Sequence, residues 1–428
     1  MQSRSAVSGL PRWSTGPRVP EPVRSFWLKL AGSLVGQVPT PFFLFSIVPV
    51  AAASARLDQS LAGLRVRHWW SAKTQPLPPL WRWWRDRGRG IEVVSEFELR
   101  AALAEGYGSD RILVNGPAKH HWLGPFTQGG LTVNFDSVTE IRALAPLARA
   151  RRWRVGLRLQ LPEEHDPEDP ACPTQFGLTH SEAALALRHL RQLGLEPEIL
   201  HFHLRTQVPS AQVYARALKQ AAELCKGLRW YPRVIDCGGG WPAEHVQDRH
   251  GRQMIKDFSP LAMSQVLRRA QTWFNGFEEY WLEVGRHICA PGGALVVGVR
   301  DSKERRGIRH LICDGGRTLH ALVSLWENHG MLVWPNRKGQ TVLTIVTGPT
   351  CMAFDQLARR HLPRSIRAGD CLLWLDAGAY HLSWETRFSH GLAAVYWHDG
   401  NEVHLLRPAE SFEAWWGRWQ NRGAARAE

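Results

Sequence analysis

Between residues 65 and 283 the sequence alternates eight short apolar runs, rich in β-branched and aromatic residues, with longer stretches in which apolar residues have a helical spacing. The eight runs, which we interpret as strands, are residues 65–71, 91–95, 112–115, 131–135, 155–161, 199–204, 233–237 and 280–283. The clearest helical stretches are residues 94–104, 138–149, 181–193, 211–228 and 261–277. Eight strands separated by helices favour a closed parallel (β/α)8 barrel of the TIM type over an open sheet, so the predicted fold class is α/β.

The pattern changes after Ala290, where strand-like alternation becomes dominant. The strands expected there are residues 294–299, 308–313, 341–346, 371–375, 393–397 and 402–406, the last two joined through Asp399 and Gly400 as a hairpin. We therefore expect a barrel domain at residues 39–290, followed by a β-rich C-terminal domain at residues 291–428. A strand at residues 42–47 belongs to one of these two domains, and residues 1–38 are predicted to be a basic, disordered tail.

Composition limits the classes of partner. The net charge of +14 raises the question of nucleic acid, but the arginine-rich runs at residues 81–90 and 149–154 fall in a predicted helix and a strand lead-in, so no nucleic-acid partner is predicted. Residues 30–55 carry no charge, but three prolines interrupt them, so no membrane segment is predicted. Seven cysteines without a C-x-x-C pair argue against a disulfide framework and favour a reducing, cytoplasmic setting.

Polar residues gather where the predicted barrel strands end. They are Lys73, Ser95, Asn115, Asp136, Arg158, His203, Thr206, the glycines after Cys237, and Glu283. In a parallel barrel the loops at the carboxyl ends of the strands are free to vary, whereas the other end maintains the fold. We therefore expect the active site at this end.

Three of these features can act together in catalysis, although each of them alone also has a purely structural explanation. Lys73 ends an apolar run, where an amine loses its proton readily enough to form a Schiff base; this segment alone favours the simpler interpretation, a lysine whose stem is buried at a strand end. The glycines of DCGGGWP (residues 236–242) bring backbone N–H groups to a phosphate or only form a tight turn. Glu283 holds a cationic ring nitrogen, with Arg286 as a phosphate ligand, or the two form a local ion pair. A lysine, a phosphate cradle and this carboxylate together specify pyridoxal 5'-phosphate.

The segment HFHLRT (residues 201–206) presents two histidines on one strand face. A metal pair is conceivable, but no third ligand is evident from the sequence. We expect His203 to stack on a ring or to line the site, and His201 to be structural, so no metal is predicted.

The order and wording of these motifs resemble the fold type III pyridoxal-phosphate decarboxylases, the ornithine, diaminopimelate and arginine decarboxylase family with an alanine-racemase-like barrel. The matching segments, in family order, are TPFFLF (40–45), SAKTQP (71–76), IEVVSEFEL (91–99), GPAK (116–119), VNFDS (133–137), LRL (157–159), FGL (176–178), HFH (201–203), DCGGGWP (236–242), EVGR (283–286), GPTC (348–351) and GAY (378–380). The resemblance extends over residues 39–408.

The resemblance implies roles for individual residues. Lys73 would bind the cofactor as an imine, Glu283 would face the pyridine nitrogen, His203 would stack on the ring and Arg158 would lie near it. Around the phosphate it places Thr206, Gly238, Gly239, Gly240, Arg286 and Tyr380. Cys351 matches a residue that in relatives reaches across a dimer interface and helps to reprotonate the α-carbon, which implies a homodimer with shared active sites. The residues alone suggest no role for Cys351.

Departures from the family pattern concern the substrate and the assembly. Met352 stands where the family usually carries an acid for the far end of the substrate, and the Arg-Pro pair of diaminopimelate decarboxylases is His-Ala at residues 320–321, so diaminopimelate is not expected. Glu327 aligns with a substrate-binding acid of ornithine-type members; it either binds a distal amine or is a solvated loop residue. Gln175 replaces a lysine that would pair with Asp355 across the dimer interface.

The leading hypothesis is a pyridoxal-phosphate-dependent carboxy-lyase that removes the α-carboxylate of an amino acid, with a distal amine as one option. A close variant acts on a modified amino acid, such as an intermediate of siderophore or natural-product biosynthesis. The hypothesis of another class is a non-catalytic relative that keeps the barrel as a binding module. Retention of Lys73, Glu283 and the three glycines disfavours it, because a module released from catalysis need not keep them.

Overall fold

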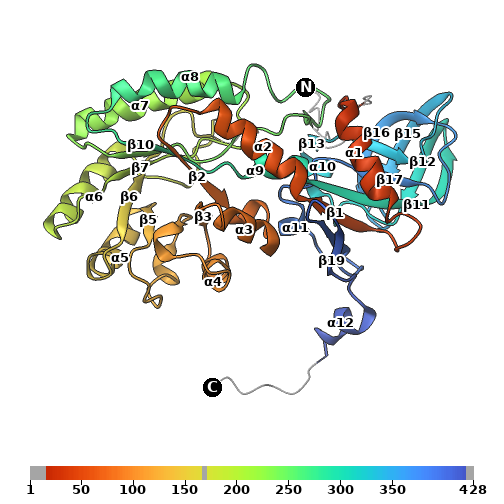
Figure 1. Ribbon diagram of the computed structural model, residues 1–428, viewed down its shortest axis with the longest axis horizontal. Helices are drawn as coiled ribbons and strands as arrows, with labels where there is room; N and C mark the ends of the chain where they lie inside the picture. Colours follow the sequence, from red (N-terminus) through yellow and green to blue (C-terminus); the bar gives the residue numbers. More distant parts are fainter. Residues whose placement is uncertain (1–15, 166–170, 421–428) are drawn as a thin grey trace, which may run out of the picture. The chain divides into compact units, whose positions relative to one another are not determined.

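The computed structural model describes residues 16–165 and 171–420, which fall into two compact units (Figure 1). The first, which we call the barrel unit, consists of residues 52–242 and 254–288. The second, the β unit, consists of residues up to 51, residues 243–253 and residues from 289 onward. The chain passes from one unit to the other within the helices α2 (Ile47–Ser60) and α9 (Gly285–Cys289), and before and after residues 243–253.

Eight parallel strands close the barrel, as predicted. They are β2 (Val66–Ser71), β3 (Gly90–Val93), β4 (Ile112–Val114), β5 (Thr132–Phe135), β6 (Arg154–Arg158), β7 (Ile199–His201), β8 (Val234–Asp236) and β10 (Glu279–Leu282). Neighbours in sequence are neighbours in the barrel, and β10 closes it against β2, with Tyr280 opposite Val66. The chain order explains this, because each crossover helix returns the chain to the next parallel position.

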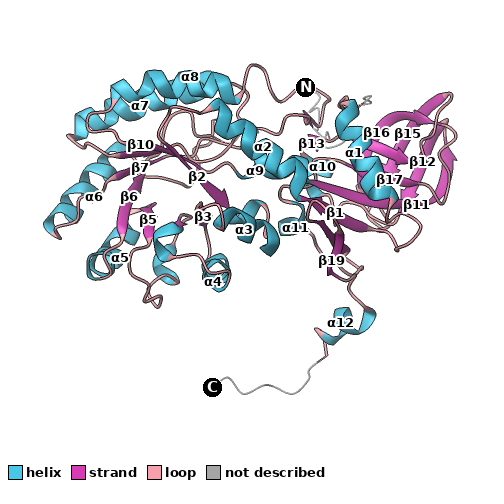
Figure 2. Ribbon diagram, viewed as in Figure 1, coloured by secondary structure: helices cyan, strands magenta, loops and turns pink. Residues whose placement is uncertain are grey.

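Helices cover the outside of the barrel strands (Figure 2). They are α3 (Pro78–Arg85), α4 (Glu96–Ala104), α5 (Val138–Ala150), α6 (His180–Gln192), α7 (Ala211–Leu228) and α8 (Pro260–Ala270). Five of the six begin after a serine or threonine whose side chain accepts a hydrogen bond from a backbone N–H of the first turn. Such caps satisfy amide groups that have no partner inside the helix, so they fix where each helix begins.

Inside the barrel, apolar and polar side chains occupy successive layers. The layer nearer the amino ends of the strands is a buried cluster of Trp69, Leu113, Ile199, Val234 and Trp281. Two residues further along the same strands, on the same inward face, lie Ser71, Asn115, His201, Asp236 and Glu283. Because side chains alternate in direction along a strand, residues two apart both point into the barrel and lie in successive layers. The apolar layer therefore lies directly below the polar site.

The β unit contains a nine-stranded sheet. Its strands are β1 (Phe42–Ser46), β11 (Gly293–Arg305), β12 (Ile308–Cys313), β14 (Met331–Trp334), β15 (Thr341–Thr347), β16 (Gln356–Pro363), β17 (Cys371–Trp374), β18 (Ala394–His398) and β19 (Val403–Arg407). The order is β16-β15-β12-β11-β1-β18-β19, with β17 pairing β11 and β14 pairing β17. A separate antiparallel pair joins β9 (Gln247–Asp248) to β13 (Glu327–Asn328). The strand predicted at residues 42–47 therefore belongs to the β unit, and β18 and β19 form the predicted hairpin.

The expectation of a disordered tail is wrong for residues 21–32, which form helix α1 (Glu21–Gly32). Trp27 and Ala31 of this helix are buried in a cluster that includes Phe42 and Val296 of the sheet. An apolar stripe at helical spacing was hidden by the arginines and prolines around it, and packing of that stripe stabilises the helix. Residues 1–15 of the predicted tail lie outside the described residues. Among the described residues, no helix combines the length and apolar character needed to cross a membrane.

Candidate active site

Lys73 lies directly after β2, in the short 3-10 helix Ala72–Thr74. Its Nζ donates hydrogen bonds to both carboxylate oxygens of Glu92, each at 2.8 Å, while 35% of the lysine side chain stays exposed. Glu92 is buried in β3 and also accepts a hydrogen bond from Ser71 Oγ at 2.5 Å. The amine is therefore oriented by a buried acid and remains accessible to a small molecule. A lysine that only extends to solvent at a strand end would not need a buried acid as its partner.

Glu283 and Asp236 are two further buried acids at inward positions, and their ionisation states differ. Burial and the charge of Glu283 raise the pKa of Asp236 well above its usual value. Burial also acts to raise the pKa of Glu283, but its interactions with nearby His201 and His203 and the charge of Lys73 outweigh it and hold this pKa well below its usual value. The surroundings therefore favour the neutral form of Asp236 and the charged form of Glu283.

The side-chain amide of Asn115 connects Glu92, which binds the Lys73 amine, to Glu283. Its Nδ2 donates to Glu283 Oε1 at 2.5 Å and lies 3.4 Å from Glu92 Oε1. Asn134 Nδ2 in turn donates to Asn115 Oδ1 at 3.0 Å and to Asp236 Oδ2 at 3.2 Å. Lys73 and Glu283 thus belong to one continuous network of buried hydrogen bonds.

His201 and His203 differ in environment, as expected. Burial lowers the pKa of His201 to about 4, so the ring is neutral, and its Nε2 lies 3.4 Å from Glu283 Oε1. His203 follows β7, is 31% exposed, and accepts a hydrogen bond from the backbone N–H of Gly239 at 3.1 Å. His201, Asp236 and Glu283 are close enough to be compared with a metal triad. Amide N–H groups already donate to three of their four carboxylate oxygens, so we assign no metal there.

The loop after β8 requires glycine at three successive positions. Gly238 and Gly240 have backbone φ values of +62° and +88°, which residues with a side chain rarely adopt. A Cβ at Gly239 would lie 2.6 Å from the carbonyl oxygen of Glu283, and one at Gly240 would overlap the carbonyl oxygen of Arg205. These three glycines therefore allow the loop to pass closely over the ends of the neighbouring strands.

Two amide groups of this loop have partners within the chain. Gly238 N–H donates to Asp236 Oδ1 at 3.0 Å, and Gly239 N–H donates to His203 Nδ1 at 3.1 Å. These bonds hold the loop to the ends of β7 and β8. Contact of these two amides with a phosphate stays a prediction.

Two arginines complete the carboxyl end of the barrel. Arg158, at the end of β6, donates to Glu164 Oε1 at 2.6 Å and lies 3.7 Å from Asp136 Oδ1, so its charge is balanced locally. Arg286, in α9, donates from Nη2 to Thr206 Oγ1 at 3.3 Å. The structure therefore brings Thr206 and Arg286 together, as the sequence interpretation required.

Comparison with known proteins identifies the family. The family model described as "Pyridoxal-dependent decarboxylase, pyridoxal binding domain" matches residues 49–290, more than half of the chain. The chain belongs to this pyridoxal-dependent decarboxylase family.

Relatives from this family match most of the chain. It is 27% identical over 390 residues to diaminopimelate decarboxylase of Deinococcus radiodurans, covering 88% of this chain and 95% of that protein. It is 26% identical over 373 residues to L-glutamyl-[BtrI acyl-carrier protein] decarboxylase of Niallia circulans, covering 82% and 86%. The crystal structure of diaminopimelate decarboxylase from Helicobacter pylori complexed with L-lysine has the same fold, with a TM-score of 0.79 at 20% identity over 92% of this chain and 99% of that one.

The residues at the carboxyl end of the barrel fit pyridoxal 5'-phosphate, the cofactor of this family. Lys73 supplies an accessible amine, Glu283 a buried anion, and residues 238–240 a loop without side chains. The protein is a pyridoxal-phosphate-dependent amino-acid decarboxylase, a carboxy-lyase. The hypothesis of a non-catalytic binding module is therefore set aside.

The remaining predicted residues, beginning with Cys351 and Met352, belong to the β unit. Cys351 is exposed, in the loop between β15 and β16, and Met352 follows it. Asp355 in the same loop is buried and accepts hydrogen bonds from Arg317 N at 2.7 Å and Thr350 Oγ1 at 2.7 Å. Asp355 is thus satisfied within its own chain, although Gln175 replaces the expected lysine.

Glu327 and Tyr380 are also constrained within the β unit. Glu327 is 3% exposed, and its Oε2 lies 2.7 Å from His329 Nε2, so the description of Glu327 as a solvated loop residue is wrong. Tyr380 has a backbone φ of +64° directly before the helix α11 (His381–Trp384). The substrate and cofactor contacts of both residues stay predictions.

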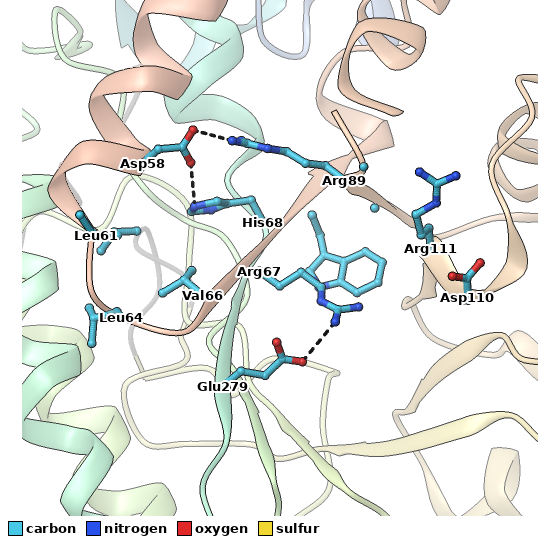
Figure 3. Close-up of a pocket in the computed structure, with 14 residues that line it drawn as sticks. Asp58, Leu61, Leu64, Val66, Arg67, His68, Arg89, Asp110, Arg111 and Glu279 are labelled. Atoms are coloured by element: carbon cyan, nitrogen blue, oxygen red, sulfur yellow. Dashed lines mark hydrogen bonds and ion pairs between the residues drawn. The ribbon is translucent and has the colours of Figure 1, made fainter. Parts of the chain in front are cut away.

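A cavity of about 550 Å³ lies at the other end of the barrel, at the amino ends of the strands (Figure 3). Its charged lining is largely paired: Arg89 with Asp58 at 2.5 Å and Arg67 with Glu279 at 3.5 Å. His68 lies beside Asp58, with 3.5 Å between Nε2 and Oδ1. Since Lys73 and Glu283 follow the carboxyl ends of their strands, this cavity is not the site described above.

The sequence interpretation missed Glu92, Asn134 and Asp236 as parts of the site. All three are inward residues of barrel strands, and all are buried. The signal was present, because an acid or amide inside a short apolar strand is costly to bury and needs partners. Tracing polar residues at intervals of two along each strand, and not only after its end, would have found them.

Proposed function

We propose that Lys73 is the cofactor lysine and that the network joining it to Glu283 is the reaction centre for loss of the α-carboxylate. The observation that carries this proposal is the single buried network that holds an accessible amine and a buried anion at the carboxyl end of the barrel. When bound, pyridoxal 5'-phosphate supplies a ring that accepts the electrons of the bond being broken. Glu92 orients the Lys73 amine and balances its charge until the amine is used.

The other residues act by charge and position. The carboxylate of Glu283 would stabilise a proton on the ring nitrogen of the bound cofactor, and His203 would cover the ring. Arg158, held by Glu164, borders the ring. The phosphate would be held by Thr206, Gly238, Gly239, Gly240, Arg286 and Tyr380. By holding the cofactor and the substrate in a fixed orientation, these residues would provide much of the rate gain.

We assign return of a proton to the α-carbon to the thiol of Cys351, which is exposed on its own chain. In the family that the sequence resembles, the matching residue acts across a dimer interface, so the proposed enzyme is a homodimer with shared sites. All seven cysteines are free thiols, which suits a reducing, cytoplasmic location. Many surface arginines of residues 81–90 and 149–154 pair with acids, which supports the absence of a nucleic-acid partner.

For the substrate, we place Met352 rather than Glu327 at the end remote from the α-carbon, because the Glu327 carboxylate is directed to His329. An apolar contact there does not select a charged distal amine. The second candidate, a decarboxylase of a modified or conjugated amino acid, draws support from Met352 and from the His-Ala pair at residues 320–321. A relative named for a carrier-bound glutamyl substrate is consistent with it.

Visible absorption of the purified protein tests the role of Lys73. We expect a cofactor band in the wild type that shifts to the position of the free aldehyde or disappears in Lys73→Ala, with loss of carbon dioxide release. Lys219→Ala, a change in α7, is the matched control and should retain both. A wild-type band and activity that survive in Lys73→Ala would overturn the proposal. A carbon dioxide release screen over basic, acidic and conjugated amino acids then identifies the substrate class.

A further inference from the structure

Three histidines meet in the interior of the β unit, outside the residues that the proposed reaction uses. His320 precedes α10 (Ala321–Leu325), His329 follows β13, and His381 begins α11. They are 0%, 1% and 3% exposed. One ligand atom from each ring lies within 4.8 Å of the ligand atoms of the other two. Three separate segments of the chain therefore converge on one buried point.

Backbone carbonyl groups fix the ring orientation of two of these histidines. His381 Nδ1 lies 2.8 Å from the carbonyl oxygen of Ala379, and His329 Nδ1 lies 2.9 Å from that of Leu375. A carbonyl oxygen can only accept, so Nδ1 carries the hydrogen in both rings and Nε2 faces the cluster. Histidines that bind metals are commonly held in this way through the nitrogen that does not bind the ion.

The third ring has a nitrogen without a partner. His320 Nδ1 lies 2.6 Å from His381 Nε2, while His320 Nε2 is buried and forms no hydrogen bond among the described residues. Burial, followed by the charges of His381, His329 and Arg360, lowers the pKa of His320 well below its usual value, so this ring is neutral. Because His381 Nε2 carries no hydrogen, His320 Nδ1 donates to it, and an ion bound between these two nitrogens would move that hydrogen to His320 Nε2.

A carboxylate completes the group. Glu327 Oε2 lies 2.7 Å from His329 Nε2, and the Glu327 side chain is 3% exposed. Because His329 Nδ1 already carries a hydrogen, its Nε2 lone pair and the carboxylate can approach this closely only if a proton or another cation lies between them. Buried Arg360 nearby opposes a cation, whereas the buried carboxylate of Glu327 beside His329 favours one.

We propose that His320, His329 and His381 form a structural site for a divalent transition metal of the zinc type, which the Glu327 carboxylate beside His329 closes as the fourth ligand when the ion binds. Three imidazoles and one carboxylate are ligands that Zn²⁺ accepts, and a buried site with four protein ligands leaves no position for a substrate. Tetrahedral ligands about 2.0–2.2 Å from Zn²⁺ are separated by roughly 3.3 Å. The pairs at 2.6 and 2.7 Å therefore have to part by less than about 1 Å to admit the ion.

The bound ion would tie the segments before α10, after β13 and at the start of α11. Tag-free holoenzyme, dialysed and then titrated with Zn²⁺ alone, should hold one equivalent per chain as measured by elemental analysis. Co²⁺ in its place should give the visible bands of a tetrahedral nitrogen and oxygen site, at longer wavelength than the cofactor band. His320→Gln and Glu327→Gln should each weaken Zn²⁺ binding by at least about 100-fold, because loss of a ligand exceeds the 10–100-fold effect of changing an outer partner.

His404→Ala is the matched control, since His404 belongs to the same unit and its side chain is 46% exposed. It should bind Zn²⁺ like the wild type. Zn²⁺ binding by the wild-type protein shows whether the site exists, even if a variant of a buried residue folds poorly. Absence of stoichiometric Zn²⁺ or Co²⁺ binding by the wild type would overturn the proposal, and so would equally tight binding by folded His320→Gln and Glu327→Gln. The proposed decarboxylation is independent of this result, because its test is the Lys73 band.

Discussion

Substitution of Gly240 by alanine tests whether the glycine loop is shaped by backbone geometry. Gly240 has a φ of +88°, and an added Cβ would overlap the carbonyl oxygen of Arg205 and lie 3.3 Å from Tyr214 Oη. The carbonyl of Gly240 also accepts a hydrogen bond from Val208 N at 2.8 Å. The loop therefore cannot move away from Arg205 without disturbing the segment that follows β7.

Two costs add in this variant. The left-handed backbone costs about 1–2 kcal/mol for a residue with a Cβ, and forcing a methyl group into a packed site costs about 1–3 kcal/mol more. We therefore expect Gly240→Ala to lose about 2–5 kcal/mol of stability in the loop. Gly194→Ala isolates the first cost, because Gly194 has a φ of +69° and nothing lies within 4 Å of its added Cβ.

The assay measures cofactor affinity and urea unfolding of both variants. Gly240→Ala should bind pyridoxal 5'-phosphate at least about tenfold more weakly than the wild type, since 1.4 kcal/mol corresponds to a factor of ten. Gly194→Ala should bind it normally and unfold at slightly lower urea concentration. If Gly240→Ala matches Gly194→Ala in both measurements, the steric account of the loop is wrong.

Three further predictions concern stability. Burial and the charge of Glu92 raise the pKa of Glu98 to about 7, so between about pH 4.5 and 7 the folded state binds more protons than the unfolded state and its stability falls as pH rises. Glu98→Gln should therefore gain up to about 3 kcal/mol of unfolding free energy above pH 7 and nothing near pH 4. A gain that does not depend on pH would contradict this. Trp281→Ala should cost about 3–5 kcal/mol in urea unfolding because it opens a cavity under the site, whereas exposed Trp419→Ala should cost almost nothing; equal effects would refute the packed apolar layer. Ser259→Ala should cost about 1 kcal/mol, measured in the same way, and an unchanged midpoint would show that its cap bond to α8 is unimportant.

The barrel could be predicted from the sequence because local pattern and global fold agree. Each apolar run of three to six residues is separated from the next by a helical or turn segment, and five of the helices have a side-chain cap, so all eight strands were found and only their ends shifted. In the β unit the hairpin of β18 and β19 was found for the same reason, since Asp399 and Gly400 mark its turn.

Elements stabilised by distant contacts were missed. β14 and β16 have irregular patterns and are stabilised by pairing with β17 and β15, which no local signal reveals. Helix α1 was taken for disorder because its apolar stripe is short and its partners lie in β1 and β11. Propensity alone does not decide such segments, because tertiary packing outweighs it.

The site was predictable where polar residues follow strand ends and less so inside the strands. Lys73, His203 and Glu283 were singled out in this way and their roles stay predictions, while the structure joins Lys73 and Glu283 through buried Asn115. Glu92 was missed because it lies within an apolar strand. The contact of Glu327 with His329 was also missed, although residues two apart along an extended strand such as β13 lie on the same face.

Reduction with borohydride and peptide mapping of the wild-type holoenzyme tests the central claim most directly. The account predicts one labelled peptide per chain, containing residues 71–76, with the label on Lys73. A label on any other lysine, or a protein that retains cofactor and releases carbon dioxide yet yields no labelled peptide, would contradict it.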